Sequence, residues 1–365
     1  MKMPAEHICE EIRKSGAISF ARFMDLSLYC PETGYYEKKK DNVGRAGDFI
    51  TSVSTGSLFG ELLAFQFGGW LDTLRSAGKQ LTIVEAGAHD GKLAADILGW
   101  LRTHRPDLLA TMHYCLVEPS PSRQQWQREK LKDHPNICWA TGFDELSTLP
   151  KFASRSGIIF SNELLDALPV HRLGWDASQK SWFEWGVTLD GEKFGWTRLP
   201  EPVHGSRLPM QAPPELLAVL PDNYTIEISP AAESWWRTAA GCLNHGKLLA
   251  IDYGFGDGEM FSPGRTRGTL RAYSRHHVSD DLLANPGGQD LTAHINFAAI
   301  QRVGESSGLR TEIFCTQPQF LTRILGEAMK NSSFGSWNPK RTRQFQTLTH
   351  PEHLGRAFRV LVQTR

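Results

Sequence analysis

The sequence predicts an α/β protein with a doubly wound, mostly parallel sheet, and two observations lead to this prediction. Short apolar runs alternate with stretches of helical apolar spacing through much of the 365-residue chain. The first of these runs, residues 81–84, ends at Glu85 and enters a turn that contains Gly87 and Gly91. Strands that alternate with helices favour parallel pairing, because each helix carries the chain back to the starting edge of the sheet.

Helices and a long loop are expected before the first strand. Apolar residues recur at helical spacing in residues 5–28, which predicts two short helices. Residues 30–53 are rich in turn-forming residues, and we expect their glycine-rich part, residues 44–52, to act as a lid. A further helix is expected over residues 58–70.

The core then alternates strands with helices. We expect helices over residues 93–101 and 123–131 and another that begins at Pro230, and strands over residues 81–85, 113–118, 137–140, 157–160, 247–252, 309–315 and 357–363. Residues 170–200 alternate aromatic with polar positions, Asp190-Gly191 is a typical hairpin turn, and a proline-rich segment follows to Pro221.

These patterns divide the chain into three parts. Residues 1–78 hold the N-terminal helices and the lid loop, and residues 79–169 with 226–365 form the core. Residues 170–225 are expected to form an inserted β-rich subdomain that binds an acceptor or a partner.

Charge and composition exclude several classes of protein. Lys plus Arg and Asp plus Glu each number 40, so no net charge attracts the chain to nucleic acid or to an anionic membrane. The N-terminal residues lack the apolar core of a signal peptide and no apolar run could span a bilayer, which predicts a cytoplasmic protein. The six cysteines form no C-x-x-C pair and the histidines lack metal-ligand spacing, so we expect reduced cysteines and no metal site.

The turn after the first strand suits a nucleoside ligand that carries a positive charge. It lacks the G-x-G-x-x-G spacing with which a dinucleotide fold holds a pyrophosphate. The acid Glu85 suits a cation instead, and S-adenosylmethionine carries a sulfonium and an amino group but no phosphate. We therefore predict that Glu85, Gly87, Ala88 and Gly91 bind this methyl donor.

The ends of the second and third strands offer groups for the rest of such a donor. Glu118, followed by Pro119, closes an apolar run, and a carboxylate there can accept hydrogen bonds from both ribose hydroxyls. A solvated glutamate that caps a helix is the alternative for Glu118. Phe143 and Asp144 would contact the adenine, but their loop is equally typical of an ordinary turn.

Two carboxylates after the next strand predict an acceptor site. If a helical turn begins at Ser161 or Asn162, Glu163 and Asp166 share one face of it. Such a pair can orient the planar guanidinium of an arginine toward the methyl group of the donor. The alternative is that both acids only cap and solubilise the start of a helix.

Several separated segments resemble those of one family, the MidA-like class I methyltransferases, whose mitochondrial members are assembly factors for respiratory complex I and methylate a protein arginine. The matching segments are PETGYY (31–36), GDFITS (47–52), FGEL (59–62), VEPS (117–120), NELLDALPV (162–170), DYG (252–254), GTLRAY (268–273) and DLTAH (290–294). The resemblance implies a Rossmann-like methyltransferase core whose seven-stranded sheet is parallel except for its C-terminal strand. It also implies S-adenosyl-L-methionine as the cofactor and a protein arginine as the acceptor.

The resemblance also guides the assignment of site residues. Catalysis is assigned to Asn162, Glu163 and Asp166. Acceptor binding is assigned to Tyr35, Asp48, Thr51, Ser52, Asp252 and Tyr253. The expected partners are a protein substrate, for which a respiratory-complex subunit is a candidate, and a second copy of the chain in a homodimer, but no nucleic acid.

Two positions depart from the family pattern. His89 stands where the family usually has a third glycine, and Val53-Ser54 stands where Pro-Glu is usual. The first departure affects the donor turn, and the second removes an acid near the expected acceptor.

A non-catalytic assembly factor or chaperone with the same fold is the alternative function. It would bind a partner through an exposed aromatic patch on the insertion. The aromatic residues of that patch would be Trp182, Phe183, Trp185 and Trp196. A dinucleotide oxidoreductase is disfavoured because the glycine motif of that class is missing.

Overall fold

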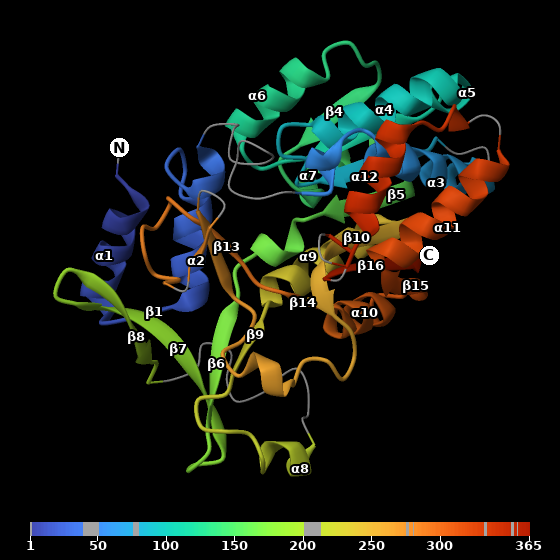
Figure 1. Ribbon diagram of the computed structural model, residues 1–365. Helices are drawn as coiled ribbons and strands as arrows, with labels where there is room; N and C mark the ends of the chain where they lie inside the picture. Colours follow the sequence, from blue (N-terminus) through green and yellow to red (C-terminus); the bar gives the residue numbers. More distant parts are fainter. Residues whose placement is uncertain are drawn as a thin grey trace.

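The computed structural model describes residues 2–38, 51–75, 80–200, 213–274, 277–279, 281–331, 334–351, 354–355 and 357–365. At its centre lies a sheet in which seven strands follow the order β4-β3-β2-β5-β10-β16-β15, and β14 pairs with β10 (Figure 1). These strands are β2 (Thr82–Ala86), β3 (His113–Val117), β4 (Ile137–Ala140), β5 (Ser156–Asn162), β10 (His245–Phe255), β14 (Ile295–Asn296), β15 (Arg310–Thr316) and β16 (Phe358–Thr364).

The strand directions confirm the predicted fold class. Every pair from β4 to β10 is parallel. The C-terminal strand β16 runs antiparallel to both β10 and β15. The sheet is therefore mostly parallel with an antiparallel C-terminal strand, as the resemblance implied.

Helices cover both faces of this sheet. One face packs against α3 (Leu58–Arg75), α4 (Lys92–His104), α11 (Gln317–Lys330) and α12 (Pro339–Thr349). The other face packs against α7 (Phe143–Thr148), α9 (Pro230–Cys242) and α10 (Phe297–Ser306). Successive residues of a strand point to opposite faces of the sheet. Ile83 belongs to the hydrophobic cluster on the first face, and Val84 belongs to the cluster on the second face. Two further helices, α5 (Pro106–Leu109) and α6 (Pro121–Lys130), flank β3 in the chain.

A second sheet joins the N-terminal segment to residues of the expected insertion. Its path is β1-β7-β6-β9, and β8 pairs with β7. These strands are β1 (Ile18–Ser19), β6 (His171–Asp176), β7 (Ser181–Asp190), β8 (Lys193–Arg198) and β9 (Thr225–Ile228). The helices α1 (Pro4–Ser15) and α2 (Phe20–Tyr29) lie beside this sheet (Figure 1). As expected, β7 and β8 form a hairpin, which turns at Gly191 with φ of 62°.

The aromatic residues of the hairpin pack inward. The Phe20 and Trp196 rings lie 5.2 Å apart, and the Phe23 and Phe194 rings lie 5.7 Å apart. Trp182, Phe183, Trp185 and Trp196 are all half-buried. The exposed aromatic patch that the non-catalytic alternative requires is therefore not found at these four residues.

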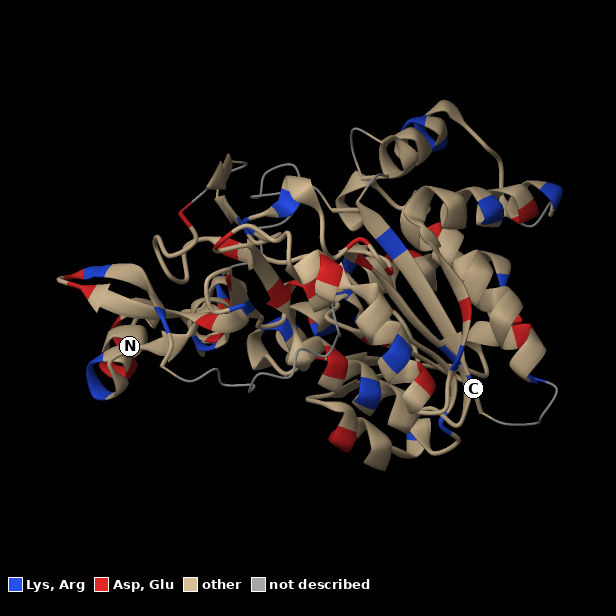
Figure 2. Cartoon of the chain, turned by 90° about the horizontal axis from the view of Figure 1, so that it is seen from below, with Lys and Arg blue, Asp and Glu red and all other residues tan. Residues whose placement is uncertain are grey.

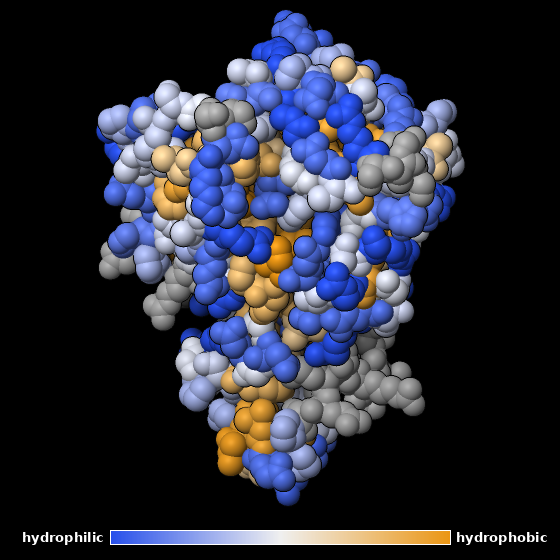
Figure 3. Space-filling view, turned by 90° about the vertical axis from the view of Figure 1, so that its right-hand side faces the viewer, coloured by the Kyte–Doolittle hydropathy of each residue, from blue (hydrophilic) through white to orange (hydrophobic). Residues whose placement is uncertain are grey.

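A small sheet and a short helix lie outside the two larger sheets. A small sheet, β12-β11-β13, is formed by β11 (Arg271–Ser274), β12 (His277–Ser279) and β13 (Asp290–Thr292). The short helix α8 (Pro214–Leu217) lies at one end of the molecule, where the space-filling view shows a hydrophobic area (Figure 3). The next residue but one, Val219, is 73% exposed. The sequence patterns did not predict α8, α10, α11, α12 or this small sheet.

Charged residues of both signs are interspersed along the molecule (Figure 2). This distribution agrees with equal numbers of acidic and basic residues. Among the described residues, the helices are too short or too polar for any of them to cross a membrane.

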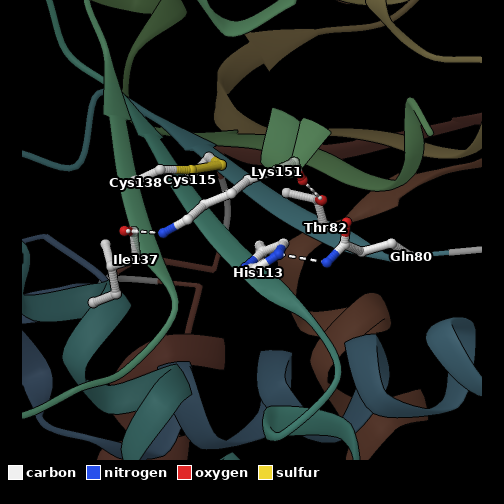
Figure 4. Close-up of a disulfide and its surroundings, with 7 residues drawn as sticks. All are labelled: Gln80, Thr82, His113, Cys115, Ile137, Cys138 and Lys151. Atoms are coloured by element: carbon white, nitrogen blue, oxygen red, sulfur yellow. Dashed lines mark hydrogen bonds between the residues drawn. A yellow bond between two sulfur atoms is a disulfide. The ribbon is translucent and has the colours of Figure 1, made fainter. Parts of the chain in front are cut away.

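One pair of cysteines contradicts the expectation that all six are reduced. Cys115 on β3 and Cys138 on β4 are register partners, with Cα atoms 4.6 Å apart, and they form a disulfide (Figure 4). Beside it, Lys151 donates from Nζ to the carbonyl of Ile137 on β4 (Figure 4). The sequence separation of 23 between the two cysteines hid this pairing in the sequence. The remaining cysteines, Cys9, Cys30, Cys242 and Cys315, are free.

Two glycines allow three central strands to lie side by side where they begin. Gly157 on β5 and Gly246 on β10 are register partners, with φ of 143° and 137°. A Cβ on Gly157 would lie 1.9 Å from the carbonyl oxygen of Thr82 on β2. Both the backbone angle and the close approach therefore require glycine.

We expect Gly157→Ala to lower the free energy of unfolding by at least about 2 kcal/mol, because the left-handed φ and the clash with Thr82 add together. Urea denaturation followed by circular dichroism measures the change. The matched control is Gly99→Ala in α4, where a Cβ meets nothing within 4 Å. That control gains up to about 1 kcal/mol from helix propensity, and equal midpoints for the two variants would contradict the prediction.

Candidate active site

The register of the parallel strands brings their carboxyl ends to one edge of the sheet. Ala86 of β2 is opposite both Val117 of β3 and Ser161 of β5. Asn162, the last residue of β5, is opposite Ile251 of β10. Residues that follow these strands therefore share the edge where open α/β sheets bind their ligands.

The turn after β2 has a backbone conformation that favours glycine. Gly87, His89 and Gly91 have φ of 75°, 48° and 82°, all in the left-handed region. A Cβ on Gly87 would lie 2.8 Å from Cδ1 of Leu164. His89 thus adopts at this turn a conformation that a glycine would adopt without strain. Burial lowers the pKa of His89, and its carbonyl accepts a hydrogen bond from Gln127.

The carboxyl of Glu85 lies inside the sheet. It is 3% exposed, and its Oε2 accepts a 2.5 Å hydrogen bond from the hydroxyl of Tyr114 on β3. Burial raises the pKa of Glu85 to about 8, although the Tyr114 hydrogen bond acts in the opposite direction. The Glu85 carboxyl is thus bonded to a neighbouring strand inside the sheet, two residues before Gly87.

Glu118 is fully buried after β3 and holds several donors. Its Oε1 accepts the amide of Ser120 at 3.0 Å, and its Oε2 accepts Nε2 of Gln127 at 3.2 Å. Burial raises the pKa of Glu118, whereas the nearby Arg123 lowers it. These contacts exclude the alternative of a solvated capping glutamate, since Glu118 is 0% exposed.

Phe143 and Asp144 line an open cavity of about 330 Å³. The cavity is bordered by Phe143, Asp144, Leu168, Ala231, Ser234, Trp235 and Thr238. Phe143 packs edge to face on Trp235 of α9, with ring centroids 5.3 Å apart. The contribution of α9 to this cavity could not be predicted from the sequence, because Phe143 and Trp235 are far apart in the chain.

The segment after β5 differs from the expected helical turn at Ser161 or Asn162. The strand β5 includes Asn162, Glu163 has a left-handed φ of 50°, and a 3-10 turn follows over Leu165–Ala167. Glu163 and Asp166 consequently do not share a helix face. Two donors hold the Oε1 of Glu163, namely Nδ2 of Asn162 at 3.0 Å and the amide of Ser52 at 3.1 Å.

Asp252, three residues before the end of β10, fixes this segment. Its Oδ2 accepts the amides of Leu164, Leu165 and Asp166 at 3.2, 2.8 and 3.4 Å. Its Oδ1 accepts the amide of Tyr253 at 2.8 Å. Burial raises the pKa of Asp252 to about 7.

Four buried carboxyl groups lie close enough to influence one another. Burial raises the pKa of Asp166 well above its ordinary value, and the charges of Asp252, Asp290 and Glu163 raise it further. Burial likewise raises the pKa of Glu163 to about 8, with contributions from Asp252 and Asp290. Asp290 accepts a 2.8 Å hydrogen bond from the hydroxyl of Tyr36.

The remaining residues assigned to the acceptor lie around these acids. Tyr35 and Tyr36 pack edge to face at 5.2 Å, and Tyr35 is only 2% exposed. Tyr253 packs against Phe358 at 4.0 Å. Thr51 is buried, and Ser52 donates from Oγ to Oε1 of Gln317 on α11 at 3.2 Å. Asp48 and the rest of the lid, residues 44–50, lie outside the described residues.

Asp290, Tyr36 and Gln317 were not chosen as site residues from the sequence. They lie more than 200 residues from the groups that they bind, as in the pair Tyr36 and Asp290 with a separation of 254. Tyr36 and Asp290 had a readable signal, since they lie in the family-like segments 31–36 and 290–294. Across the described part of the chain, no three His, Cys, Asp or Glu side chains are arranged to hold a metal ion.

The strand order, the glycine turn and the acids at the strand ends define a class I methyltransferase that uses S-adenosyl-L-methionine as its methyl donor. The model of one family, described as "Putative S-adenosyl-L-methionine-dependent methyltransferase", matches residues 62–315. The chain belongs to this family, which confirms the resemblance found in its sequence.

Known relatives extend over nearly the whole chain. It is 29% identical over 395 aligned positions to "Protein arginine methyltransferase NDUFAF7 homolog, mitochondrial" of Drosophila melanogaster, with 98% of this chain and 84% of the relative covered. The protein named "Protein arginine methyltransferase NDUFAF7, mitochondrial" of Danio rerio is 28% identical, with 97% and 85% covered. A protein from Burkholderia thailandensis, solved bound to S-adenosyl-homocysteine, is 29% identical with a TM-score of 0.83, with 99% and 92% covered.

The raised pKa values of the buried acids predict how stability depends on pH. Glu163, with a pKa of about 8, stays protonated in the folded chain at pH values where the unfolded chain has released this proton. Its contribution to stability is complete below about pH 4.5 and is lost as the pH rises toward 8, by up to about 1.4 kcal/mol per pH unit.

We expect Glu163→Gln to make the decline in stability between pH 5.5 and 7.5 shallower, because the amide does not titrate. Urea denaturation at several pH values measures the slope. Glu11→Gln, at an exposed pair with Arg22, serves as the control and should keep the slope of the parent protein. An unchanged slope in Glu163→Gln would show that this carboxyl is already ionised in the folded protein.

Proposed function

We propose that the chain transfers the methyl group of S-adenosyl-L-methionine to an arginine side chain of a protein. The buried acids after β5 and β10 are the observation that carries this proposal. Among the described residues, the largest influences on Glu163 and Asp166 are burial, other acids and hydrogen-bond donors rather than a cation. A guanidinium would supply the positive charge that these buried carboxyl groups lack.

The donor half of the proposed site follows β2, β3 and β4. Its residues are Glu85, Gly87, Ala88, Gly91, Glu118, Pro119, Phe143 and Asp144. Glu118 would accept hydrogen bonds from the ribose, and the loop at Phe143 would contact the adenine. The crystal structure of the Burkholderia thailandensis relative with S-adenosyl-homocysteine supports a donor site on this fold.

The acceptor half follows β5 and β10. Asn162, Glu163 and Asp166 would act in catalysis, and Tyr35, Asp48, Thr51, Ser52, Asp252 and Tyr253 would surround the acceptor. The donor supplies an electrophilic methyl carbon, so the chain's own task is to aim a guanidinium nitrogen at it and to exclude water. A bound guanidinium would favour the ionised form of Glu163, whose pKa burial otherwise raises to about 8, and the carboxylate could then take up the proton that the nitrogen loses.

We also propose a role for each of the three parts of the chain. Residues 79–169 and 226–365 would hold the donor, and residues 1–78 would supply the lid. Residues 170–225 would meet the acceptor protein, which is supported by their pairing with the N-terminal strand β1. A respiratory-complex subunit as the acceptor, a role in its assembly, a homodimer and a cytoplasmic location complete the proposal and rest on the sequence alone.

We expect the full chain to transfer radiolabel from S-adenosyl-L-methionine to a protein of a cell lysate, and mass spectrometry of that protein should find methylarginine. The acceptor side is tested by Glu163→Gln, which should lower kcat/KM for the acceptor roughly 100-fold, since a positioned proton acceptor contributes about that much. The same variant should bind S-adenosyl-homocysteine with the affinity of the parent protein in titration calorimetry.

The reverse pattern is expected for the donor side. Glu118→Gln should weaken S-adenosyl-homocysteine binding roughly tenfold, because one charge-assisted hydrogen bond is lost. If Glu163→Gln weakened donor binding and left acceptor use intact, the division into two half-sites would be wrong. Label on a residue other than arginine would reject the acceptor class while leaving the methyltransferase activity in place.

A further inference from the structure

Arg123 of α6 lies between two carboxyl groups but bonds to only one of them. Its Nη2 donates to Oε1 of Glu37 at 3.3 Å. Its Nε lies 3.7 Å from Oε1 of Glu118, which is beyond hydrogen-bond distance. Among the described residues this buried Nε has no hydrogen-bond partner, so Arg123 interacts with Glu118 through charge at this longer distance but does not hydrogen-bond to it.

Glu37 is itself fixed in place by neighbours. Its Oε2 accepts a 2.6 Å hydrogen bond from the hydroxyl of Ser120, and its side chain is only 12% exposed. It ends the 3-10 turn η1 (Tyr35–Glu37), where the preceding Tyr36 donates to Asp290. The Tyr36 ring also lies under the guanidinium of Arg123, 5.6 Å from its carbon.

The two carboxyl groups compete for one guanidinium. A charge-assisted hydrogen bond between arginine and a carboxylate is normally about 2.8 Å long, so a shift of about 1 Å would let Arg123 bond to Glu118. Glu118 already accepts from Ser120 and Gln127. A third strong donor would occupy the capacity of Glu118 to accept hydrogen bonds from a ligand.

We propose that Glu37 is a positioning residue for donor binding, which holds Arg123 away from Glu118 and so leaves that carboxylate free to accept hydrogen bonds from the donor. This inference rests on the role proposed above for Glu118. Glu37 touches neither the donor nor the acceptor in this arrangement, and it acts only through Arg123 and Ser120.

Titration calorimetry of the full chain with S-adenosyl-homocysteine tests this role. Glu37→Gln removes the charge that holds Arg123, so Arg123 should bond to Glu118 and the Kd should rise roughly tenfold. The double variant Glu37→Gln with Arg123→Gln removes the competing cation as well. Its Kd should return to within about threefold of the parent protein, a recovery that damage to the fold by Glu37→Gln would not allow.

A matched control comes from a second glutamate–arginine pair, Glu11 with Arg22. Glu11→Gln disrupts the exposed contact with Arg22 and should leave the Kd unchanged. Parent-like affinity in Glu37→Gln, or a double variant that binds no better than Glu37→Gln, would overturn the role of Glu37.

The same titrations separate this inference from the proposed function. Unchanged affinity in Glu118→Gln would remove Glu118 from the donor site, and the role of Glu37 would fail with it. Weakened binding in Glu118→Gln together with parent-like binding in Glu37→Gln would overturn the role of Glu37 alone.

Discussion

The carboxyl group of Asp252 is the constraint on which the rest of the proposed site depends. It accepts three successive amides, those of Leu164, Leu165 and Asp166, and its other oxygen accepts the amide of Tyr253. A chain that leaves a strand and turns at once has amides without partners, and a buried carboxylate needs donors. The Asp252 carboxylate and the amides of the turn therefore satisfy each other's hydrogen bonds. Because Asp252 lies on β10 and the turn follows β5, the register of β5 on β10 determines where the acids of the turn lie.

The buried acids lower the stability of the empty protein near neutral pH. Glu163 has a raised pKa and a left-handed φ of 50°, and both features cost free energy in the folded state. Such costs are typical of functional sites, where they persist because the surrounding structure is rigid. A cationic acceptor would recover part of the cost by favouring the charged carboxylates, which couples binding of the acceptor to relief of an unfavourable arrangement.

The sequence predicted the local structure at β2 and β3 better than the segment after β5, because the two parts are built differently. The glycine turn, Glu118 and the alternating strands are local signals, so their order along the chain determines the fold. The helical turn at Ser161 was predicted wrongly because the amides of that turn are taken by Asp252, 86 to 88 residues away. The helix α11 had a readable signal, since Thr316 and Gln319 form a capping box with a proline in the first turn. The pairing of the two cysteines and the hydrogen bond between Tyr36 and Asp290 could not be read from the sequence, since each joins residues whose spacing has no regular period.

Residues outside the central sheet hold the acids of the proposed acceptor site in place. The amide of Ser52 holds Glu163, the hydroxyl of Ser52 bonds to Gln317 of α11, and Gln317 in turn donates to the carbonyl of Leu348 in α12. Tyr36 reaches Asp290 from the N-terminal segment. Segments near both ends of the chain, outside the consecutive strands and helices of the core, therefore contact the acids. The glycine turn after β2, in contrast, is formed by consecutive strands and helices. Under the proposed function, substitutions in these outer segments would alter the acceptor without disturbing the donor. The replacement of Pro-Glu by Val53-Ser54 would be of this kind, because the hydrogen bonds of Ser54 within the described part of the chain stay in its own turn, with Thr51.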